Sequence, residues 1–392
     1  MRPGIVVQHG RLPVRSRELV RCDVTAFIGF ISEEKWPEGM TAGDFVEIPL
    51  RREPDLWEHP HWRRFDQASV RAVHDFFVNN GDALFLFGVC IRSTVDFETP
   101  ATATEIFVPL LDRLRAEDDI AVLASPALAW LPVSVSRLGE AHTDAEHVYD
   151  LLLVHCREMN NRFLILDPPR GLHGDLLVRW VRDFRARETH TRSYGALYYP
   201  WLFEGGTTFP PSASLAGIYA RIEKEKGEYG VVWPPANVPV NGVTHLELDL
   251  DFTEAGDMAE ASINPLILQA GRGIVVFGAR TLSTDLAYRF INSRRIISMI
   301  TEQLRRDNEW AVFETNNPHL WDVLERDVRY RLEQFWRAGL LAGERAGEEY
   351  AVTCNTSNNP RYLLDAGQVN VEIRMKPVGT AEQIVIDLRL GG

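Results

Sequence analysis

Histidine and cysteine side chains gather near the middle of the chain, where they could bind a metal ion. His142, His147, His155 and Cys156 follow one another closely, and imidazole nitrogen and thiolate sulfur are ligands that zinc prefers. His142 and His147 are five positions apart, whereas the two histidines of a zinc-binding helix lie at i and i+4, on one face. The spacing therefore disfavours a metal site, and we expect these histidines on the surface or in the core.

Acidic residues further along the chain could bind calcium, and they follow one another at short intervals: Glu247, Asp249, Asp251, Glu254 and Asp257. An EF-hand loop needs a glycine at its sixth position and a bidentate glutamate at its twelfth. The run lacks both, so a solvated loop is the expected structure.

Motifs for phosphate binding and for acyl transfer are absent from the sequence. Gly271, Gly273 and Gly278 lack the G-x-G-x-x-G spacing and fall in a strand-like context, and no G-x-S-x-G nucleophile motif occurs. We therefore expect no cofactor and no catalytic site. One alternative stays open, namely a soluble α/β metabolic enzyme whose site lies in loops at residues 203–257.

The length, charge and composition of the chain limit the kinds of molecule that it can bind and the compartment in which it can act. The chain has 392 residues and a formal net charge of −13, which argues against duplex nucleic acid because phosphate binding needs a basic face. The longest apolar stretch, Ala83–Ile91, is about half of the ~18 residues that a membrane-spanning helix needs. The N-terminus lacks the apolar core of a signal peptide. With four widely spaced cysteines, we expect free thiols and a cytoplasmic product.

From Val24 the hydrophobic pattern predicts alternating strands and helices. Continuous apolar runs are typical of strands covered on both faces, and they occur at residues 24–30, 83–91, 120–124, 163–166 and 196–201. Apolar residues at helical spacing predict helices at 66–79 and 174–187, and Thr143 with Glu146 predicts a capping box that opens another. This alternation is typical of an α/β layer with a largely parallel sheet.

The remaining segments differ in character. Residues 203–257 are rich in proline and glycine and predict long ordered loops or a passage between domains. The last third predicts α+β structure, with strands at 274–279, 310–314 and 368–375 and helices at 284–306 and 319–338. The α/β and α+β regions together indicate two domains.

Apolar extended segments lie at both ends of the chain, at residues 5–7 and 384–390. An unpaired apolar strand invites aggregation, so each segment is expected to pair with another strand. The pattern leaves two partners open: a strand of the same subunit, or a strand of a neighbouring chain.

A series of sequence blocks follows in a fixed order through the chain. They are SYGALYYPWL (193–202), PPSASLAGIYAR (210–221), WPPAN (233–237), SIN (262–264), GRGIVVFGARTLS (271–283), INSRRI (291–296), FETNNPHLW (313–321), FWRAGLLAG (335–343) and TAEQIVIDLRL (380–390), preceded by PGIVV and TAFIGF near the N-terminus. In this order and spacing they resemble the tail sheath proteins of contractile phage tails and phage-tail-like injection particles. The sequence departs from the family pattern at Ser262, Thr315 and Gln383, where the family often has glycine, proline and an aromatic residue.

The resemblance implies a two-domain α/β and α+β fold. A discontinuous inner domain, a mixed sheet with helices, is built from both chain ends, and an outer α/β domain is inserted between them. Residues 1–22 would then form an N-terminal arm, residues 23–257 the outer domain and residues 258–392 the inner sheath domain. A C-terminal strand arm would occupy about 380–392.

The resemblance also implies roles for particular residues. Strand-donating arms between subunits would use Ile5, Val6 and Val7 at the N-terminus, and Ile384, Val385, Ile386, Leu388 and Leu390 at the C-terminus. Arginines on the helix at 319–338 are candidates for contacts with the inner tube: Arg326, Arg329, Arg331 and Arg337. Structural residues of the family motifs would be Asn264, Gly273, Gly278, Arg280, Glu314 and Asn316.

The implied function is mechanical rather than enzymatic. Sheath subunits polymerise as stacked hexameric rings around an inner tube, and contraction drives the tube through a target envelope. The implied partners are further copies of the chain, the inner tube protein, and baseplate and cap or terminator proteins, with no nucleic acid and no direct membrane insertion. The particle would be a virion tail or a headless particle, and a chain that lacks extra outer domains favours the headless particle. It would be assembled in the cytoplasm and released by lysis. A baseplate-proximal or cap-proximal sheath paralogue is the alternative.

Overall fold

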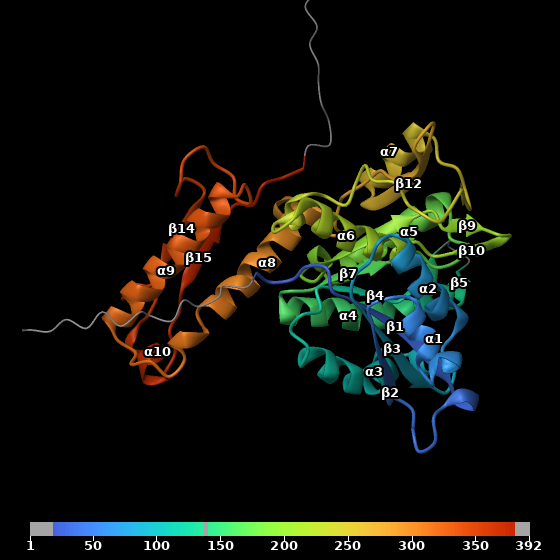
Figure 1. Ribbon diagram of the computed structural model, residues 1–392, viewed down its shortest axis with the longest axis horizontal. Helices are drawn as coiled ribbons and strands as arrows, with labels where there is room; N and C mark the ends of the chain where they lie inside the picture. The colour runs from blue at the N-terminus through green and yellow to red at the C-terminus, as the bar shows by residue number, and fades with distance from the viewer. Residues whose placement is uncertain (1–18, 137–139, 381–392) are drawn as a thin grey trace, which may run out of the picture.

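The computed structural model describes residues 19–136 and 140–380, and most of them surround one eight-stranded sheet (Figure 1). The order across the sheet is β13-β12-β8-β7-β4-β1-β3-β2. Neighbours from β3 to β12 pair in parallel, while β2 and β13 pair antiparallel at the two edges. The strands are β1 (Thr25–Ser32), β2 (Phe45–Leu50), β3 (Leu84–Ile91), β4 (Val122–Ala124), β7 (Phe163–Leu166), β8 (Gly195–Tyr199), β12 (Ile263–Gln269) and β13 (Gly273–Val276).

Helices cover both faces of this sheet. One face packs against α2 (Gln67–Val78) and α6 (Ser212–Lys226), which share an apolar core with the strands. The opposite face packs against α3 (Pro100–Arg115), α4 (Ala145–Met159) and α5 (Gly174–Arg187). The sheet is therefore buried on both faces, which explains why its strands are continuous apolar runs instead of alternating patterns.

Smaller elements complete the α/β part. A three-stranded sheet has the order β10-β9-β11, and a hairpin pairs β5 with β6. The elements are β5 (Val133–Val135), β6 (Ala141–Thr143), β9 (Leu202–Glu204), β10 (Thr207–Phe209), β11 (His245–Leu246), α1 (Pro54–Glu58) and α7 (Phe252–Glu260).

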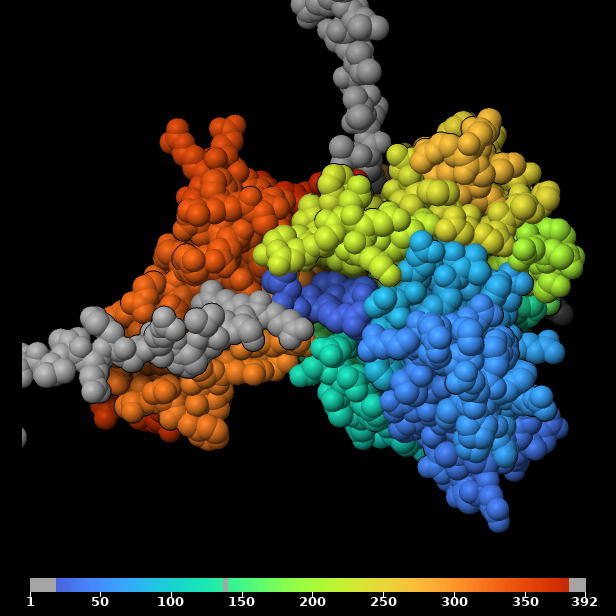
Figure 2. Space-filling model, viewed as in Figure 1, coloured from blue at the N-terminus to red at the C-terminus, as the bar shows by residue number. Residues whose placement is uncertain are grey.

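The C-terminal part projects to the left of the α/β part in Figures 1 and 2, and α8 (Ile291–Asp307) connects the two. It has its own apolar core, in which Ile300, Leu332 and Phe335 are fully buried. Its other elements are α9 (Pro318–Arg337), β14 (Tyr350–Thr353), α10 (Arg361–Asp365) and β15 (Glu372–Met375). The part of the chain from α8 onward thus has an apolar core apart from those on the two faces of the main sheet.

Several predicted elements are confirmed. The predicted α/β layer with a largely parallel sheet is present, and α2, α5 and α9 lie within a residue or two of their expected bounds. The helix predicted from residue 284 begins only at Ile291. The helix after Thr143 begins at Ala145, with Asp144 as an N-cap whose side chain makes no capping bond. The predicted pair nevertheless interacts, since Thr143 Oγ1 accepts from the Ala145 N–H and Glu146 Oε1 accepts from the Thr143 N–H, both at 3.4 Å.

Two predictions are wrong. Residues 203–257 are not long loops, since they contain α6 and the start of α7. Residues 310–314 are not a strand: a 3-10 helix ends at Ala311, and Val312 and Phe313 are exposed. Val312 and Phe313 thus face solvent, whereas Trp310 and Ala311 pack against the cluster of Leu320, Trp321 and Leu324.

The main sheet extends beyond residue 257, where the resemblance implied a domain boundary, because β12 pairs with β8 and β13 pairs with β12. Near the other end, Val20 donates its backbone N–H to Gln303 of α8, and Cys22 packs against the C-terminal core. Chain before the first strand of the sheet thus lies beside the C-terminal part. No helix among residues 19–136 and 140–380 is long and apolar enough to span a membrane.

Candidate assembly site

Asn264 holds together three of the sequence blocks, those at residues 193–202, 262–264 and 271–283. Its side-chain amide donates to the carbonyl oxygens of Leu197 at 3.1 Å and Arg280 at 2.8 Å, and its Oδ1 accepts from the Arg280 backbone N–H at 2.7 Å. The residue is 1 % exposed. Asn264 thereby fastens the segment after β13 to β8 and β12, which is a structural role.

The glycines of the same motif have steric roles. A Cβ on Gly278 would lie 2.8 Å from Asn264 Oδ1 and 2.9 Å from its Cα, so the backbone can pass Asn264 only without a side chain. Gly273 follows the β12–β13 turn at a φ of 76°, where a side chain is strained. Ser262, which replaces a common family glycine, also has a positive φ of 65°. A glycine at this position, which the resemblance led us to expect, would adopt this φ without strain.

Arg280 and Asn316 fix loops, whereas Glu314 does not. Arg280 donates from Nη1 to the Ala259 carbonyl at 2.6 Å. Asn316 donates to the Gln368 carbonyl at 3.0 Å and accepts from Trp321 Nε1 at 2.9 Å, which ties the start of α9 to the segment before β15. The Glu314 side chain is exposed and forms no ion pair with another described residue.

The two-stranded sheet of the C-terminal part has open edges. β14 and β15 pair antiparallel from Tyr350–Met375 to Thr353–Glu372, and within the described part of the chain neither strand pairs with any further strand. One face of the sheet packs on the C-terminal core. The expected arm residues Ile5–Val7 and Ile384, Val385, Ile386, Leu388 and Leu390 lie outside the described residues.

The candidate arginines of α9 fall into two groups. Arg326, Arg329 and Arg337 are exposed, and each lies within 4 Å of an acidic residue of the same helix. Arg331 instead points inward, with Nε 2.8 Å from Asp307 Oδ2 at the end of α8, and the two side chains are 7 % and 12 % exposed. Within one subunit only the first three can face a partner.

Acidic and basic side chains also join α8 to the α/β part, which the sequence pattern did not indicate. Glu302 accepts hydrogen bonds from Arg305 and Arg306, and these arginines reach Asp118 at 3.1 Å and Asp119 at 3.2 Å in the loop between α3 and β4. Burial opposes ionisation of Glu302, but the two arginines outweigh it and lower its pKa. The signal in the sequence, two adjacent arginines, is also typical of an ordinary solvated helix face.

One buried carboxyl group has no cation beside it. Asp167 follows β7 and accepts hydrogen bonds from the backbone N–H of Ser212, at 2.8 Å, and from the Ser212 hydroxyl. It therefore anchors the start of α6. Burial raises its pKa to about 7, although the bonds from Ser212 act in the opposite direction.

The residues that could do chemistry are not brought together. His155 is buried beside Arg162, and burial, with this cation, lowers its pKa to about 3. His147 contacts the Phe97 carbonyl at 2.8 Å. Asp251 and Glu254 form a capping box on α7 rather than a calcium loop. Nowhere in residues 19–136 and 140–380 do three potential metal ligands cluster, and all four cysteines are free thiols.

Asn264 and the Arg331–Asp307 pair fasten elements of the fold to one another, and within residues 19–136 and 140–380 the outer edges of β14 and β15 pair with no further strand, which is an arrangement suited to assembly. Comparison with known proteins identifies the chain further. The family model of the phage tail sheath central domain matches residues 145–282, and that of the phage tail sheath C-terminal domain matches residues 283–391. The chain therefore belongs to the phage tail sheath family.

Individual relatives agree with this assignment. The tail sheath protein of Enterobacteria phage T4 is 23 % identical over 370 residues, which cover 91 % of this chain and 48 % of the phage protein. The helical sheath of the anti-feeding prophage in its contracted state has a TM-score of 0.72 at 22 % identity and covers 99 % of this chain and 98 % of that one. A chain in the baseplate of the same particle has a TM-score of 0.72 at 21 % identity, with 100 % and 99 % covered.

The chain spans about half the length of the curated relatives it matches. The relatives and structural neighbours are structural sheath proteins, so the chain is not an enzyme, and the metabolic-enzyme alternative is wrong.

Proposed function

We propose that this protein is the repeating subunit of a contractile sheath. Copies stack as hexameric rings around an inner tube, and a change from an extended to a contracted arrangement drives the tube through a target envelope. The observation that carries the proposal is the β14–β15 sheet, which has open edges in a chain whose ends are apolar strand-like segments. A free strand edge and a free strand are complementary, because each offers the backbone hydrogen bonds that the other lacks.

The arms are the proposed links between subunits. Residues 5–7 of one neighbour and 384–390 of another add to the free edges of β14 and β15, which makes a sheet shared by several chains. Backbone hydrogen bonds do not depend on which side chains face each other. Such links survive a rearrangement in which the side-chain contacts between rings exchange, so that the sheath changes its length without coming apart.

The exposed face of α9 is the proposed contact with the tube. Arg326, Arg329 and Arg337 are 70 %, 52 % and 70 % exposed. Exposed ion pairs contribute little to stability, about 0–1 kcal/mol each, and their partners can be exchanged at small cost. A polar surface of this kind suits a contact that has to break when the sheath releases the tube.

A second candidate function is a sheath paralogue next to the baseplate. It is favoured by the match to a chain in the baseplate of the anti-feeding prophage, which covers the whole chain. In either role the partners are further copies of the chain, the tube protein, and baseplate and cap or terminator proteins. We propose assembly in the cytoplasm, and release by lysis as part of a phage tail or headless particle.

The arms provide the test. A chain truncated after Ala381 should fold with an unchanged circular dichroism spectrum yet form no tubes or stacked rings in negative-stain electron microscopy. A chain lacking only Gly391 and Gly392 is the matched control and should assemble normally. Normal sheath from the long truncation would contradict the proposed strand addition. A full-length protein that stays monomeric at high concentration, with or without the tube protein, would contradict the sheath function itself.

A further inference from the structure

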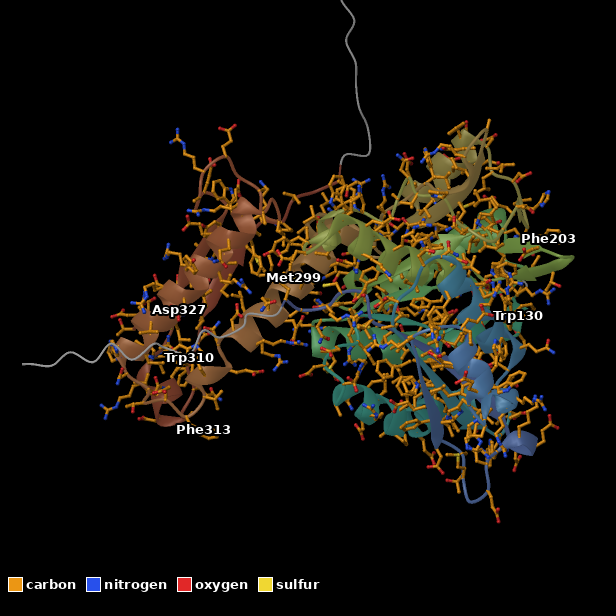
Figure 3. All side chains as sticks on the ribbon, in the orientation of Figure 1. Trp130, Phe203, Met299, Trp310, Phe313 and Asp327 are labelled. Atoms are coloured by element: carbon orange, nitrogen blue, oxygen red, sulfur yellow. The ribbon has the colours of Figure 1, made fainter. Side chains whose placement is uncertain are left out.

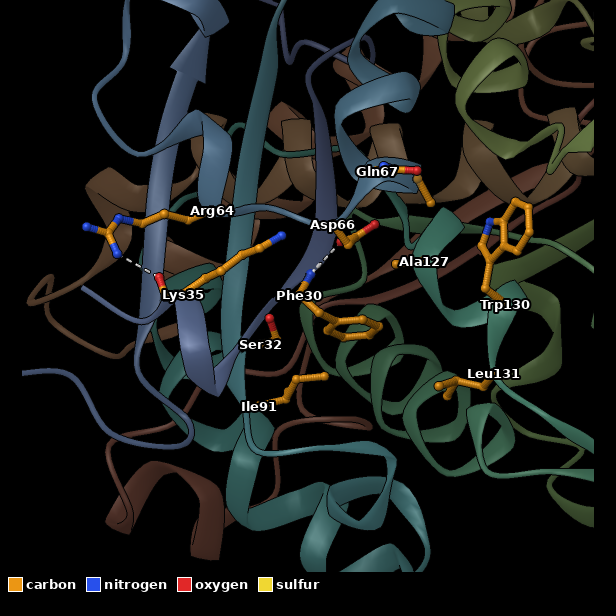
Figure 4. Close-up of a pocket in the computed structure, with 11 residues that line it drawn as sticks. Phe30, Ser32, Lys35, Arg64, Asp66, Gln67, Ile91, Ala127, Trp130 and Leu131 are labelled. Carbon is orange, nitrogen blue, oxygen red and sulfur yellow. Dashed lines mark hydrogen bonds between the residues drawn. The ribbon is translucent and has the colours of Figure 1, made fainter. Parts of the chain in front are cut away.

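The main sheet contains a crevice of the kind that binds ligands in other α/β proteins. β1 lies between β3 and β4 in the sheet, so the strands that follow β1 in the chain add first on its β3 side and then on its β4 side. In doubly wound sheets ligands bind at the carboxyl ends of the strands where the order reverses in this way. A cavity of about 410 Å³ lies there, lined by Phe30 and Ser32 from β1, Gln67 from α2 and Trp130 after β4 (Figure 4). Its size falls in the range of small-molecule sites, roughly 300–1,000 Å³.

Trp130 gives the crevice a fixed apolar wall. Its ring packs edge-on against Trp201, with 5.0 Å between the centroids, and the guanidinium of Arg170 lies 4.6 Å from its centroid. Trp201 is itself buried and donates Nε1 to the Pro168 carbonyl at 3.0 Å. Trp130 nevertheless remains 37 % exposed. An indole that is held from two sides and left partly open is preorganised to stack against a flat ring.

Polar side chains without partners line the same crevice. The Ser32 hydroxyl, the Lys35 ammonium group and the Gln67 amide form no hydrogen bond or ion pair with any other described residue. Figure 4 shows Lys35 and Trp130 on opposite sides, with Ser32 and Phe30 between them. A ligand that stacks on Trp130 would therefore extend its polar end toward a free cation and two free hydrogen-bonding groups.

The crevice disfavours phosphate. In nucleotide-binding folds of this type a phosphate sits at the N-terminus of a helix. Here Asp66 occupies the N-terminus of α2, where its carboxylate accepts from Phe30 N at 2.8 Å, Ser69 N at 2.8 Å and Ser69 Oγ at 2.6 Å. The Ser69 N–H is thereby already satisfied, and a phosphate beside this carboxylate would be repelled. The anion that suits Lys35 is thus a singly charged group.

We propose that this crevice is a binding site for a small organic carboxylate that carries one flat ring face, either an aromatic acid or an acidic sugar. The ring stacks on Trp130, the carboxylate pairs with Lys35, and Ser32 and Gln67 bind the remaining polar substituents. The site lies in the α/β part and uses neither α9 nor the free edges of β14 and β15. It is a further function, independent of the proposed role in a sheath.

The test is isothermal titration calorimetry of the full-length protein with two probes, 4-hydroxybenzoate for the aromatic class and glucuronate for the sugar class. At least one should bind, and its neutral counterpart, 4-hydroxybenzyl alcohol or glucose, should bind about tenfold more weakly or not at all, because the charged hydrogen bond to Lys35 is lost. AMP should bind no more tightly than the carboxylate. Which acid binds identifies the class.

Variants locate the binding. Lys35→Gln and Trp130→Ala should each weaken binding of the acid by about tenfold. Lys226 and Trp233 provide matched controls, since the Lys226 ammonium lies 4.5 Å from the Trp233 ring and that indole is 52 % exposed outside the crevice. Lys226→Gln and Trp233→Ala should leave the affinity unchanged. The proposal is overturned if neither acid binds the wild type at about 10 mM, if AMP binds more tightly, or if the Lys35→Gln and control variants behave alike.

Discussion

Arg331 distinguishes a structural arginine from the arginines proposed to face the tube. Its guanidinium is buried against Asp307 and also donates from Nη1 to Gln334 at 2.9 Å. Arg331→Met keeps the length and apolar stem of the side chain but removes the cation, so that Asp307 is left as a carboxylate in a site where its side chain is 12 % exposed. The variant therefore tests the ion pair without opening a large cavity.

The structure sets the size of the effect. Removing one partner of a buried ion pair costs about 3–5 kcal/mol. Asp307 keeps a hydrogen bond from Gln303 at 3.0 Å, and its remaining exposure lets water reach it, so we expect the lower end, about 3 kcal/mol. For a chain of 392 residues that unfolds as one unit, the unfolding entropy is about 0.8 kcal/mol/K, so this corresponds to a fall in Tm of about 4 °C. Arg326→Met, at a side chain that is 70 % exposed, should change the stability by no more than about 0.5 kcal/mol.

Differential scanning calorimetry of the unassembled subunit measures the difference, and electron microscopy of sheaths grown with the tube protein measures assembly. Arg331→Met should unfold early, whereas Arg326→Met should unfold normally and bind the tube less well. The double variant Arg331→Met with Asp307→Leu should regain stability, because neither charge is then buried alone. An unchanged Tm for Arg331→Met, together with a loss of tube binding, would refute the assignment of Arg331 to the interior.

Further predictions concern the core and the charge of the subunit. Asn264→Ala removes the side-chain partner of one buried and two partly buried backbone groups and should lower the free energy of unfolding by about 3 kcal/mol in urea titrations; a change below about 1 kcal/mol would contradict the role given to Asn264. Burial raises the pKa of Asp167 to about 7 in the folded state, whereas the pKa of an unfolded aspartate is about 3.9. Between about pH 4 and pH 7 the folded chain therefore holds a proton that the unfolded chain lacks, and the free energy of unfolding falls as the pH rises. Asp167→Asn can still hydrogen-bond Ser212, and thermal unfolding should show it gaining stability over the wild type by about 2 kcal/mol or more between pH 5 and pH 8, while a pH-independent difference would count against this. Because each subunit carries a net charge of −13, sheath length measured by light scattering should depend on salt between about 0.05 and 0.5 M, and indifference to salt would speak against repulsion between rings.

The sequence predicted the parts of the fold in which each segment carries its own pattern. β1, β3 and β7 are apolar runs because both faces of the sheet are covered, and α9 has an apolar stripe because only one of its faces is. α6 escaped prediction because it is buried on almost every side and is built from serine, alanine and glycine as well as large residues. Without a polar face it shows no helical period.

The candidate site was predictable to a smaller extent. The resemblance pointed to Asn264 and Gly278, and the structure supplies the reason, a side chain and a backbone that touch. In the sequence Arg331 could not be told from the other arginines of α9. Its buried partner, Asp307, belongs to a different helix, so the pair is visible only in the structure. Contacts between elements that are distant in the sequence, such as the ion pair of Arg306 with Asp119, do not alter the hydrophobic pattern of either segment. They therefore cannot be predicted from that pattern.

The helix α8 gives this subunit a built-in lever. Its first residue, Ile291, is packed in the core of the α/β part, while Ile296, Ile300 and Leu304 are packed in the core of the C-terminal part. A helix of 17 residues is about 25 Å long, and the ion pairs that tie its last turn to Asp118 and Asp119 of the α/β part are partly exposed and can be broken at small cost. If strands shared between subunits hold the C-terminal part in place, a tilt of α8 by about 10° displaces the other end of the helix by roughly 4 Å. A small change in the angle of α8 near the axis of the polymer would then produce a larger displacement of the subunit at the outer surface.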